Sequence, residues 1–397
     1  MYNVGFGDCF LVEFPKPDGG VSRVLIDCGS TAAAPGRKMS QVVDQILSDV
    51  TDHEARKPRI DVVVCTHRHA DHVSGFANEK WADLQVKEVW MPWTENPKDP
   101  AARKIRETQS ALAVALDTTL RAVDAGGDQA PTRWQSMAAN ALTNHGAMDM
   151  LHEGFKSRPR PLFLSSDGSP TPVETGELEG VSVFVLGPSK SEDVIRDMDP
   201  PKGKTYLRQL GEPDGRDGGF DPFGPSWAIS PSAYVWTSTL LREGDQDKLE
   251  DATHAWEAAV AVALDSAVNG TSLVLAFQIQ DVVLLFPGDA QWGTWNALLG
   301  NERTRKLLQK TRFWKVGHHG SHNATPRDFL SEASFADCCA MMSTNTTKFP
   351  SIPRQPLLDA IAAKSIPLAR SDEQDSGGVK FFSWMNATQV EARIPLR

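Results

Sequence analysis

Short apolar runs bounded by turn-forming residues recur along the 397-residue chain and predict an early and a late group of strands. The early strands are expected at 8–14, 21–27, 60–65 and 86–91, and the late strands at 181–186, 272–278, 282–286, 313–316, 338–342, 366–369 and 378–384. The cluster of Pro, Gly and Asp at 15–20 joins the first two as a hairpin.

Helical periodicity fills the space between the two groups of strands. Helices are expected near 40–50, 100–125, 133–154, 250–267 and 354–364, with another directly after residue 289. The Pro-, Gly-, Asp- and Ser-rich stretch 198–232 lacks periodicity and is expected to be a long loop or lid.

Both groups of strands end in polar residues that favour one shared site. The pattern therefore favours an α/β architecture with two facing sheets covered by helices, forming one domain over 1–397 rather than two independent domains. A helical insertion is expected at about 98–158 and a loop or lid insertion at about 198–250.

Charge and cysteine content limit the classes of function. A formal net charge of −10 argues against a protein that coats nucleic acid or an anionic membrane over a broad face. No apolar run has membrane-spanning length, and the N-terminus lacks a signal-peptide pattern. The five cysteines, an odd number without a CxxC pair, are expected to be buried reduced thiols. These features predict a cytoplasmic protein that does not associate with membranes.

Candidate chemistry is densest directly after the apolar run at 60–65. His67, His69, Asp71 and His72 place four possible metal ligands within six positions. Imidazole and carboxylate groups suit zinc, manganese or iron(II) better than metals that prefer thiolates. The turn is therefore predicted to bind two metal ions side by side.

Two later strands end in the same way, at Asp289 and at His318. The order and context of these three motifs resemble the metallo-β-lactamase fold. The resemblance implies an αββα sandwich with two divalent metal ions at the open sheet edge, zinc first and manganese or iron as alternatives. It implies that His67 and His69 bind the first metal, and that Asp71, His72 and His318 bind the second. Asp289 would bridge the two metals.

A narrower resemblance comes from three segments, Asn3–Asp8, Asn269–Leu275 and Gly317–Ser321. They resemble motifs of the ComEC-type DNA-uptake proteins and their soluble relatives.

The sequence departs from the pattern of these families at two places. The strand at 181–186 is followed by Gly187-Pro188 without the usual third histidine of the first metal, for which His145 is a weak candidate. The segment 349–353 lacks the histidine of a GHP-like motif, which puts one substrate or phosphate contact in doubt.

The implied mechanism is hydrolysis by a metal-activated hydroxide. Asp71, Asp289 and His319 are the expected catalytic residues, with His319 stabilising the transition state or protonating the leaving group. Asp8, Asp27 and His322 are expected to support the ligands from behind, and His322 is a weaker candidate for the role of His319.

Three functions remain open from the sequence. The favoured one is a phosphodiesterase or nuclease, and the acidic charge makes a small nucleotide or a short end as plausible a substrate as a duplex. The second is a hydrolase of a lactone, thioester, β-lactam or phosphocholine ester, because one fold hosts many activities. The third is a non-catalytic effector that engages a protein partner through 198–232 or the helical insertion. The oligomeric state does not follow from the sequence.

Overall fold

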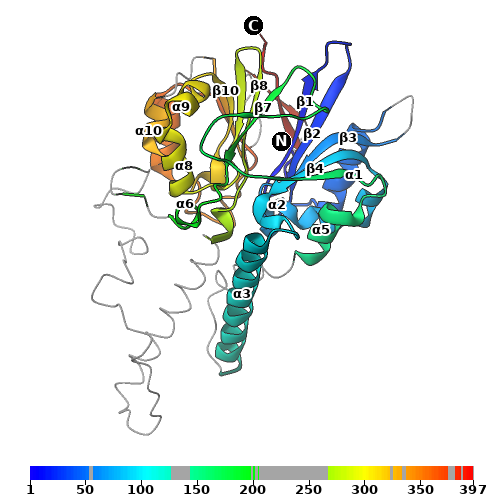
Figure 1. The fold of residues 1–397 in the computed structure, drawn as a ribbon, viewed down its shortest axis with the longest axis vertical. Helices are drawn as coiled ribbons and strands as arrows, with labels where there is room; N and C mark the ends of the chain where they lie inside the picture. Colours follow the sequence, from blue (N-terminus) through cyan, green and yellow to red (C-terminus); the bar gives the residue numbers. More distant parts are fainter. Residues whose placement is uncertain are drawn as a thin grey trace.

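The computed structural model describes residues 1–52, 57–126, 144–197, 200–201, 204, 267–321, 325–332, 337–373, 381–385 and 388–396. Within them, two β-sheets face each other and helices cover their outer faces. Figure 1 shows α8, α9 and α10 on one flank and α1 and α5 on the other, with the strands between them. This is the αββα arrangement expected from the sequence.

The first sheet has five strands in sequence order. They are β1 (Cys9–Pro15), β2 (Val21–Cys28), β3 (Arg59–Val64), β4 (Gln85–Pro92) and β5 (Arg160–Leu164). The first two form an antiparallel hairpin, and β2, β3, β4 and β5 run parallel. The carboxyl ends of these parallel strands therefore lie at one edge of the sheet.

The second sheet has seven strands, in the order β12-β11-β10-β9-β8-β7-β6. In chain order they are β6 (Pro172–Val173), β7 (Ser182–Gly187), β8 (Val274–Ile279), β9 (Val282–Phe286), β10 (Thr311–Lys315), β11 (Cys339–Met342) and β12 (Leu368–Arg370). The strands β9, β10, β11 and β12 are parallel, and β6 to β9 pair antiparallel. A separate hairpin joins β13 (Phe382–Met385) and β14 (Gln389–Ala392).

The helices connect the strands and cover the sheets. The α-helices are α1 (Met39–Asp49), α2 (Ala70–Val73), α3 (Pro100–Gly126), α5 (His145–Asp149), α6 (Glu192–Arg196), α8 (Trp292–Gly300), α9 (Glu302–Leu308), α10 (Arg327–Glu332) and α11 (Gln355–Ala363). Single turns of other helix types are η1 (Ser74–Ala77), η2 (Glu79–Asp83), η3 (Trp93–Glu95), the π-type η4 (Met150–Gly154) and η7 (Gly317–Gly320). No helix in the described ranges has the length and apolarity needed to cross a bilayer.

Strand residues alternate between different layers of the core. In β9, Leu284 and Phe286 contribute to the cluster between the two sheets, whereas Val283 and Leu285 pack under the helices outside the second sheet. Both faces of such a strand are covered, which is why it reads as a continuous apolar run rather than an alternating one.

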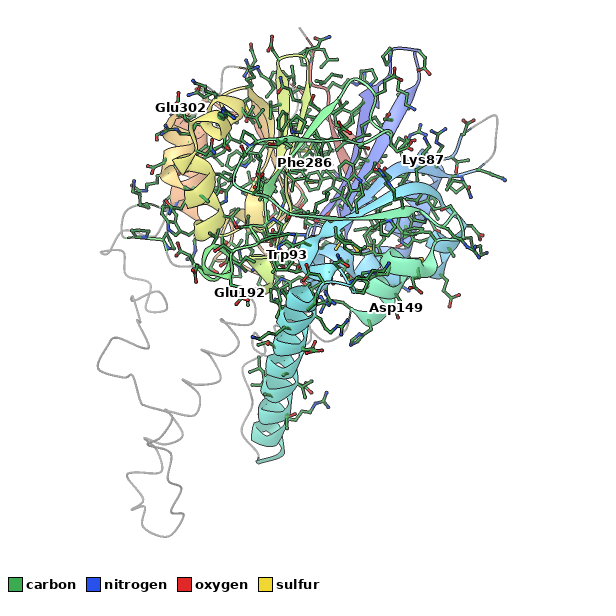
Figure 2. The ribbon with its side chains drawn as sticks, viewed as in Figure 1. Lys87, Trp93, Asp149, Glu192, Phe286 and Glu302 are labelled. Carbon is green, nitrogen blue, oxygen red and sulfur yellow. The ribbon has the colours of Figure 1, made fainter. Side chains whose placement is uncertain are left out.

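The long helix α3 belongs to the predicted insertion and projects from the body (Figure 1). Trp93 lies where the helix leaves the body (Figure 2) and packs in a small cluster with Ala102 and with Ile195 of α6. Gln109 adds a contact farther along α3, because its side-chain nitrogen donates to the Ala267 carbonyl. These contacts fix the first turns of α3 against the body.

The structure confirms most predicted elements, with boundaries shifted by a few residues. The five cysteines are buried free thiols, as expected, and Trp292 and Trp295 are buried in the core. The strand β5 was not predicted, because Pro161 interrupts its apolar run and proline is tolerated only at a sheet edge such as this one. The described part of the helix expected at 133–154 is helical, whereas most of 198–232 and of the helix expected at 250–267 lies outside the described residues.

Candidate metal centre

The candidate ligands gather where parallel strands of both sheets end. Residues 67–72 follow β3, Asp289 follows β9, and the turn η7 follows β10. The two sheets are tied together here, because the Leu273 amide donates to the Thr66 carbonyl at 2.8 Å. Gly288 has a φ of +55°, and a Cβ built on it would lie 3.2 Å from Cβ of Thr66. Glycine therefore allows the chain before Asp289 to approach the histidine-rich turn closely.

His67 and His69 form the first pair of possible ligands. The Thr66 hydroxyl donates to Oδ2 of Asp27 at 2.7 Å, so it accepts from Nδ1 of His67 at 3.1 Å. Nε2 of His67 then carries a lone pair and faces Nδ1 of His69 at 3.1 Å. Burial lowers the pKa of His67 well below its usual value, which keeps this imidazole neutral. Two zinc–nitrogen bonds at a tetrahedral angle separate the nitrogens by roughly 3.4 Å, so the pair fits one cation.

A second group contains Asp71, His72, Asp289 and His319, whose polar atoms all lie within 4.8 Å of one another. All four side chains are buried. Nε2 of His72 lies 3.2 Å from Oδ2 of Asp289 and 3.9 Å from Oδ2 of Asp71. A proton or a cation is needed between these atoms, because a lone pair facing a carboxylate is repulsive. The donor set, imidazole and carboxylate, fits a divalent metal.

Asp289 is oriented by contacts to one of its two oxygens. Oδ1 accepts from the His318 amide at 3.0 Å and from Nζ of Lys315 at 3.3 Å. Oδ2 is left facing His72 and lies 4.0 Å from Nε2 of His318. Burial opposes ionisation of Asp289, but His72 and Lys315 lower its pKa well below the usual range. Asp289 is therefore ionised and can offer Oδ2 to a metal.

Asp27 and Asp8 contact the ligand turn from the two ends of the first hairpin. Oδ1 of Asp27 accepts from the Thr66 amide at 2.7 Å, and its Oδ2 accepts from Nδ1 of His72 at 2.8 Å. The Asp8 amide donates to the Asp71 carbonyl at 2.8 Å. These contacts fix both ends of the histidine-rich turn.

Lys315 was not predicted as part of the site. It is buried, forms an ion pair with Oδ2 of Asp8 and contacts Oδ1 of Asp289. Burial would lower the pKa of Lys315, but Asp8 and Asp289 raise it above the usual value. The one available sequence signal was a single cation within the apolar strand Phe313–Val316.

The two histidines of η7 lie on different sides of the site. Both have left-handed backbone conformations, with φ of +45° for His318 and +52° for His319. Such conformations cost energy in non-glycine residues and cluster at functional sites. His318 is partly exposed, and its Nδ1 lies 2.8 Å from the Ser321 hydroxyl.

His319 points into the buried group. Its Nδ1 donates to the Ser343 carbonyl at 2.8 Å, and its Nε2 lies 3.1 Å from Oδ2 of Asp71. Burial alone would lower the pKa of His319, but the contact with Asp71 and the charge of Asp8 raise it. His319 therefore reaches Asp71 either as a proton donor or through a shared cation.

Of the two remaining predicted residues, His145 and His322, the structure describes His145. His145 is the exposed first residue of α5, and neither of the close His and carboxylate groups found in the described ranges includes it. His322 lies outside the described residues. The neighbouring Asn144 contacts the ligand turn instead, because its side-chain nitrogen donates to the Arg68 carbonyl. Arg68 also donates to Glu95 at 3.0 Å.

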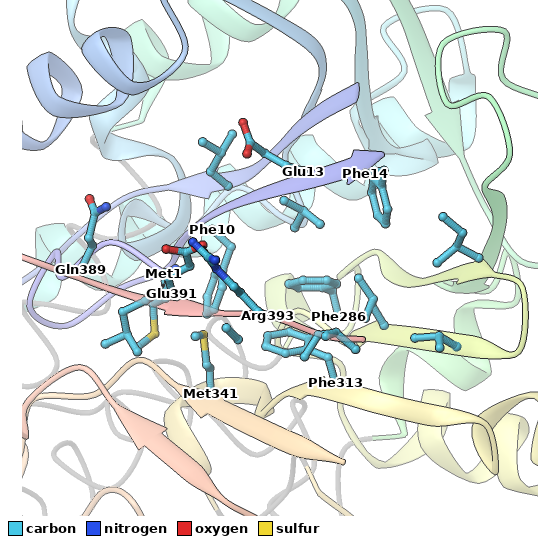
Figure 3. Close-up of a pocket in the computed structure, with 18 of the residues that line it drawn as sticks. Met1, Phe10, Glu13, Phe14, Phe286, Phe313, Met341, Gln389, Glu391 and Arg393 are labelled. Carbon is cyan, nitrogen blue, oxygen red and sulfur yellow. Dashed lines mark hydrogen bonds and ion pairs between the residues drawn. The ribbon is translucent and has the colours of Figure 1, made fainter. Parts of the chain in front are cut away.

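A cavity of about 510 Å³ lies between the sheets near β14, apart from the candidate ligands. Its walls include Phe10, Phe286, Phe313 and Met341, with Arg393 at the same site (Figure 3). None of the described residues that line it is a candidate metal ligand. The cavity is therefore distinct from the candidate metal centre.

Comparison with known proteins supports the fold and the metal site. The family model described as the metallo-beta-lactamase superfamily matches residues 2–185, which include Asp8, Asp27 and the ligand turn 67–72. The matched region together with the two facing sheets defines a metallo-beta-lactamase fold. No curated protein matches the chain. The match and the buried His and Asp group together indicate a metal-dependent hydrolase.

Proposed function

We propose that the protein is a phosphodiesterase or nuclease of the metallo-β-lactamase superfamily that uses two divalent metal ions, with zinc as the first expectation and manganese or iron as alternatives. The observation that carries this proposal is the convergence of two ligand sets at one sheet edge. One set is the His67–His69 pair, whose facing nitrogens are 3.1 Å apart. The other is formed by Asp71, His72 and Asp289, whose polar atoms lie in one buried group with that of His319.

The buried charge of the site supports the presence of more than one cation. Four carboxylates are buried around His72, those of Asp8, Asp27, Asp71 and Asp289. Against them the described part of the site supplies one permanent cation, Lys315. Buried charges need compensation, which divalent cations held by these residues would supply.

Each residue has a distinct proposed role. His67 and His69 would hold one metal, Asp71, His72 and His318 would hold the other, and Asp289 would contribute its carboxylate to both. When bound, the metals would lower the pKa of a shared water and offset negative charge on the reacting group. His319, held by Ser343, would keep a proton at Nε2 beside Asp71 and stabilise charge that develops in the transition state.

A phosphodiester is the substrate class that this arrangement favours. Two neighbouring cations suit in-line displacement at phosphorus, because they stabilise both the attacking and the leaving oxygen. The resemblance of Gly317–Ser321 and Asn269–Leu275 to motifs of ComEC-type proteins supports the same choice. The net charge of −10 favours a small nucleotide or a short nucleic-acid end over a long duplex.

The deciding experiment combines metal analysis with hydrolysis of bis-p-nitrophenyl phosphate. We expect about two metals per chain and turnover that chelation abolishes and added zinc or manganese restores. Asp289→Asn should lose both metal and turnover, whereas Asp281→Asn, at an exposed carboxylate paired with Lys310, should lose neither. Metal-loaded protein that cleaves neither phosphodiesters nor nucleotides would overturn the proposal and direct the search to lactones and thioesters.

A further inference from the structure

Three aromatic rings connect the candidate metal centre with the protein surface. The ring of Phe6 lies 4.1 Å from that of His319 and 4.1 Å from that of Phe349, measured between centroids. His319, at the inner end, reaches Oδ2 of Asp71. His319 and Phe6 are buried, whereas Phe349, at the outer end, is partly exposed. The stack therefore leads from the metal ligands to a ring that solvent can reach.

The middle ring is held in place by its backbone. Phe6 lies between Gly5 and Gly7, which have φ of +88° and +149°. A Cβ on Gly5 would come within 2.0 Å of the Ala32 carbonyl, and one on Gly7 within 2.5 Å of the Asp71 carbonyl. Gly5 thus allows this loop to approach the backbone at Ala32, and Gly7 allows it to approach the ligand turn at Asp71. Both contacts hold Phe6 beside His319.

The outer ring is tied to the histidine turn by its own loop. The Phe349 amide donates to the Asn345 carbonyl at 2.9 Å, and the Arg354 amide donates to the Gly320 carbonyl at 3.0 Å. Pro353 packs against Gly320, where an added Cβ would lie 2.7 Å from Cβ of the proline. The loop that carries Phe349 is therefore anchored to the turn that carries His318 and His319.

We propose that Phe349 forms a stacking subsite for the nucleobase of a nucleotide or short oligonucleotide whose phosphate lies at the metals. Stacking on a protein ring is tolerant of base identity, since every base has a π-face. The subsite rests on the proposed phosphodiesterase function and specifies that the substrate carries a nucleobase.

Ligand binding tests the subsite without requiring turnover. Calorimetry on the metal-loaded full chain would compare thymidine 5′-monophosphate with 2-deoxyribose 5-phosphate, which has the same phosphate but no base. We expect the nucleotide to bind at least about fivefold more tightly, as loss of one base-stacking contact implies. Phe349→Ala and Phe349→Leu should remove this preference, and Phe349→Tyr should keep it. Equal binding of the two ligands, or a preference that survives Phe349→Ala, would overturn the subsite.

Measurements of turnover distinguish the stacking subsite from the phosphodiesterase activity on which it rests. Thymidine 5′-(p-nitrophenyl phosphate) and methyl p-nitrophenyl phosphate share a leaving group and differ in the base. The ratio of their kcat/KM values should fall at least about fivefold in Phe349→Ala, through the KM of the base-bearing diester. Cleavage of both diesters with a ratio that Phe349→Ala does not change would support the phosphodiesterase and overturn the subsite. Cleavage of neither diester would contradict the phosphodiesterase, and the calorimetry would still decide the subsite.

Discussion

Nδ1 of His72 lies 2.8 Å from Oδ2 of Asp27, and this contact leaves the other ring nitrogen, Nε2, to face the proposed metal site. A carboxylate can only accept here, so Nδ1 carries the proton and Nε2 faces Asp289. Outer partners of this kind fix the tautomer and raise the basicity of a ligating histidine. Asp27 has a φ of +56°, so its position also depends on an uncommon backbone conformation that Asp and Asn tolerate best.

Replacement of Asp27 by Asn should weaken metal binding by roughly 10- to 100-fold. Asp27 accepts through both oxygens, from the Thr66 amide at Oδ1 and from His72 and the Thr66 hydroxyl at Oδ2. The amide of asparagine has one acceptor oxygen and one NH2 donor group. The variant would therefore lose the hydrogen bonds that Asp27 accepts either at Oδ1 or at Oδ2. The measurement is a metal titration against a competing chelator, with Asp18→Asn in the exposed first hairpin turn as the control. An unchanged affinity in Asp27→Asn would contradict this role.

Replacement of Lys315 by Met should destabilise the metal-free protein by about 3–5 kcal/mol. The change leaves the buried carboxylates of Asp8 and Asp289 without their shared cation. Lys310→Met is the matched control, because Lys310 pairs with Asp281 at the surface and such pairs contribute about 0–1 kcal/mol. Urea unfolding in the presence of a chelator measures both variants. Equal losses in the two variants would show that the Lys315 network is not important for stability.

The layers of the fold and the principal candidate ligands could be predicted because they depend on local patterns. Buried strands that end in His or Asp are visible in the sequence, and parallel strands bring their carboxyl ends to one sheet edge. The supporting role of Asp8 and Asp27 beside the ligands was predicted from the family resemblance alone.

Contacts between remote segments could not be predicted. In the sequence, Lys315 is a single charged residue in an apolar run. Its contacts with Asp8 and Asp289 form only in the folded protein. The stack of Phe6, His319 and Phe349 joins three segments whose proximity no periodicity encodes.

The end of the helical insertion should support the ligand turn through Asn144 rather than through His145. Asn144 is buried and donates to the Arg68 carbonyl, between His67 and His69, whereas His145 is exposed. Asn144→Ala should therefore lower metal affinity by about tenfold, and His145→Ala should leave metal content unchanged. Elemental analysis after dialysis against a weak chelator compares the two. Loss of one metal in His145→Ala would instead identify this histidine as the missing ligand of the first metal.

Metal binding should release protons, and the metal-free and metal-loaded proteins should respond to pH in opposite ways. Carboxylates raise the pKa of His72 and His319 against the effect of burial, which favours the protonated form of both histidines in the metal-free protein. A cation beside Nε2 of His72 competes with the proton of that nitrogen, so metal affinity should rise as the pH increases, with release of about one proton per chain near pH 7.

The stability of the metal-free protein should follow the opposite trend. A histidine whose folded pKa is raised contributes stability that is complete below its unfolded pKa of about 6.5 and is lost as the pH rises through the folded value. Burial lowers the pKa of His67, of His152 and of the Met1 amino group, and these groups act in the opposite sense. Burial raises the pKa of four thiols, which act in the same sense as His72 and His319: Cys9, Cys65, Cys338 and Cys339. Unfolding midpoints of chelator-treated protein between about pH 6 and 9 should therefore fall with increasing pH, and those of metal-loaded protein should rise or stay level. A metal-free midpoint that rises over this range would contradict a net stabilisation by the groups whose pKa is raised.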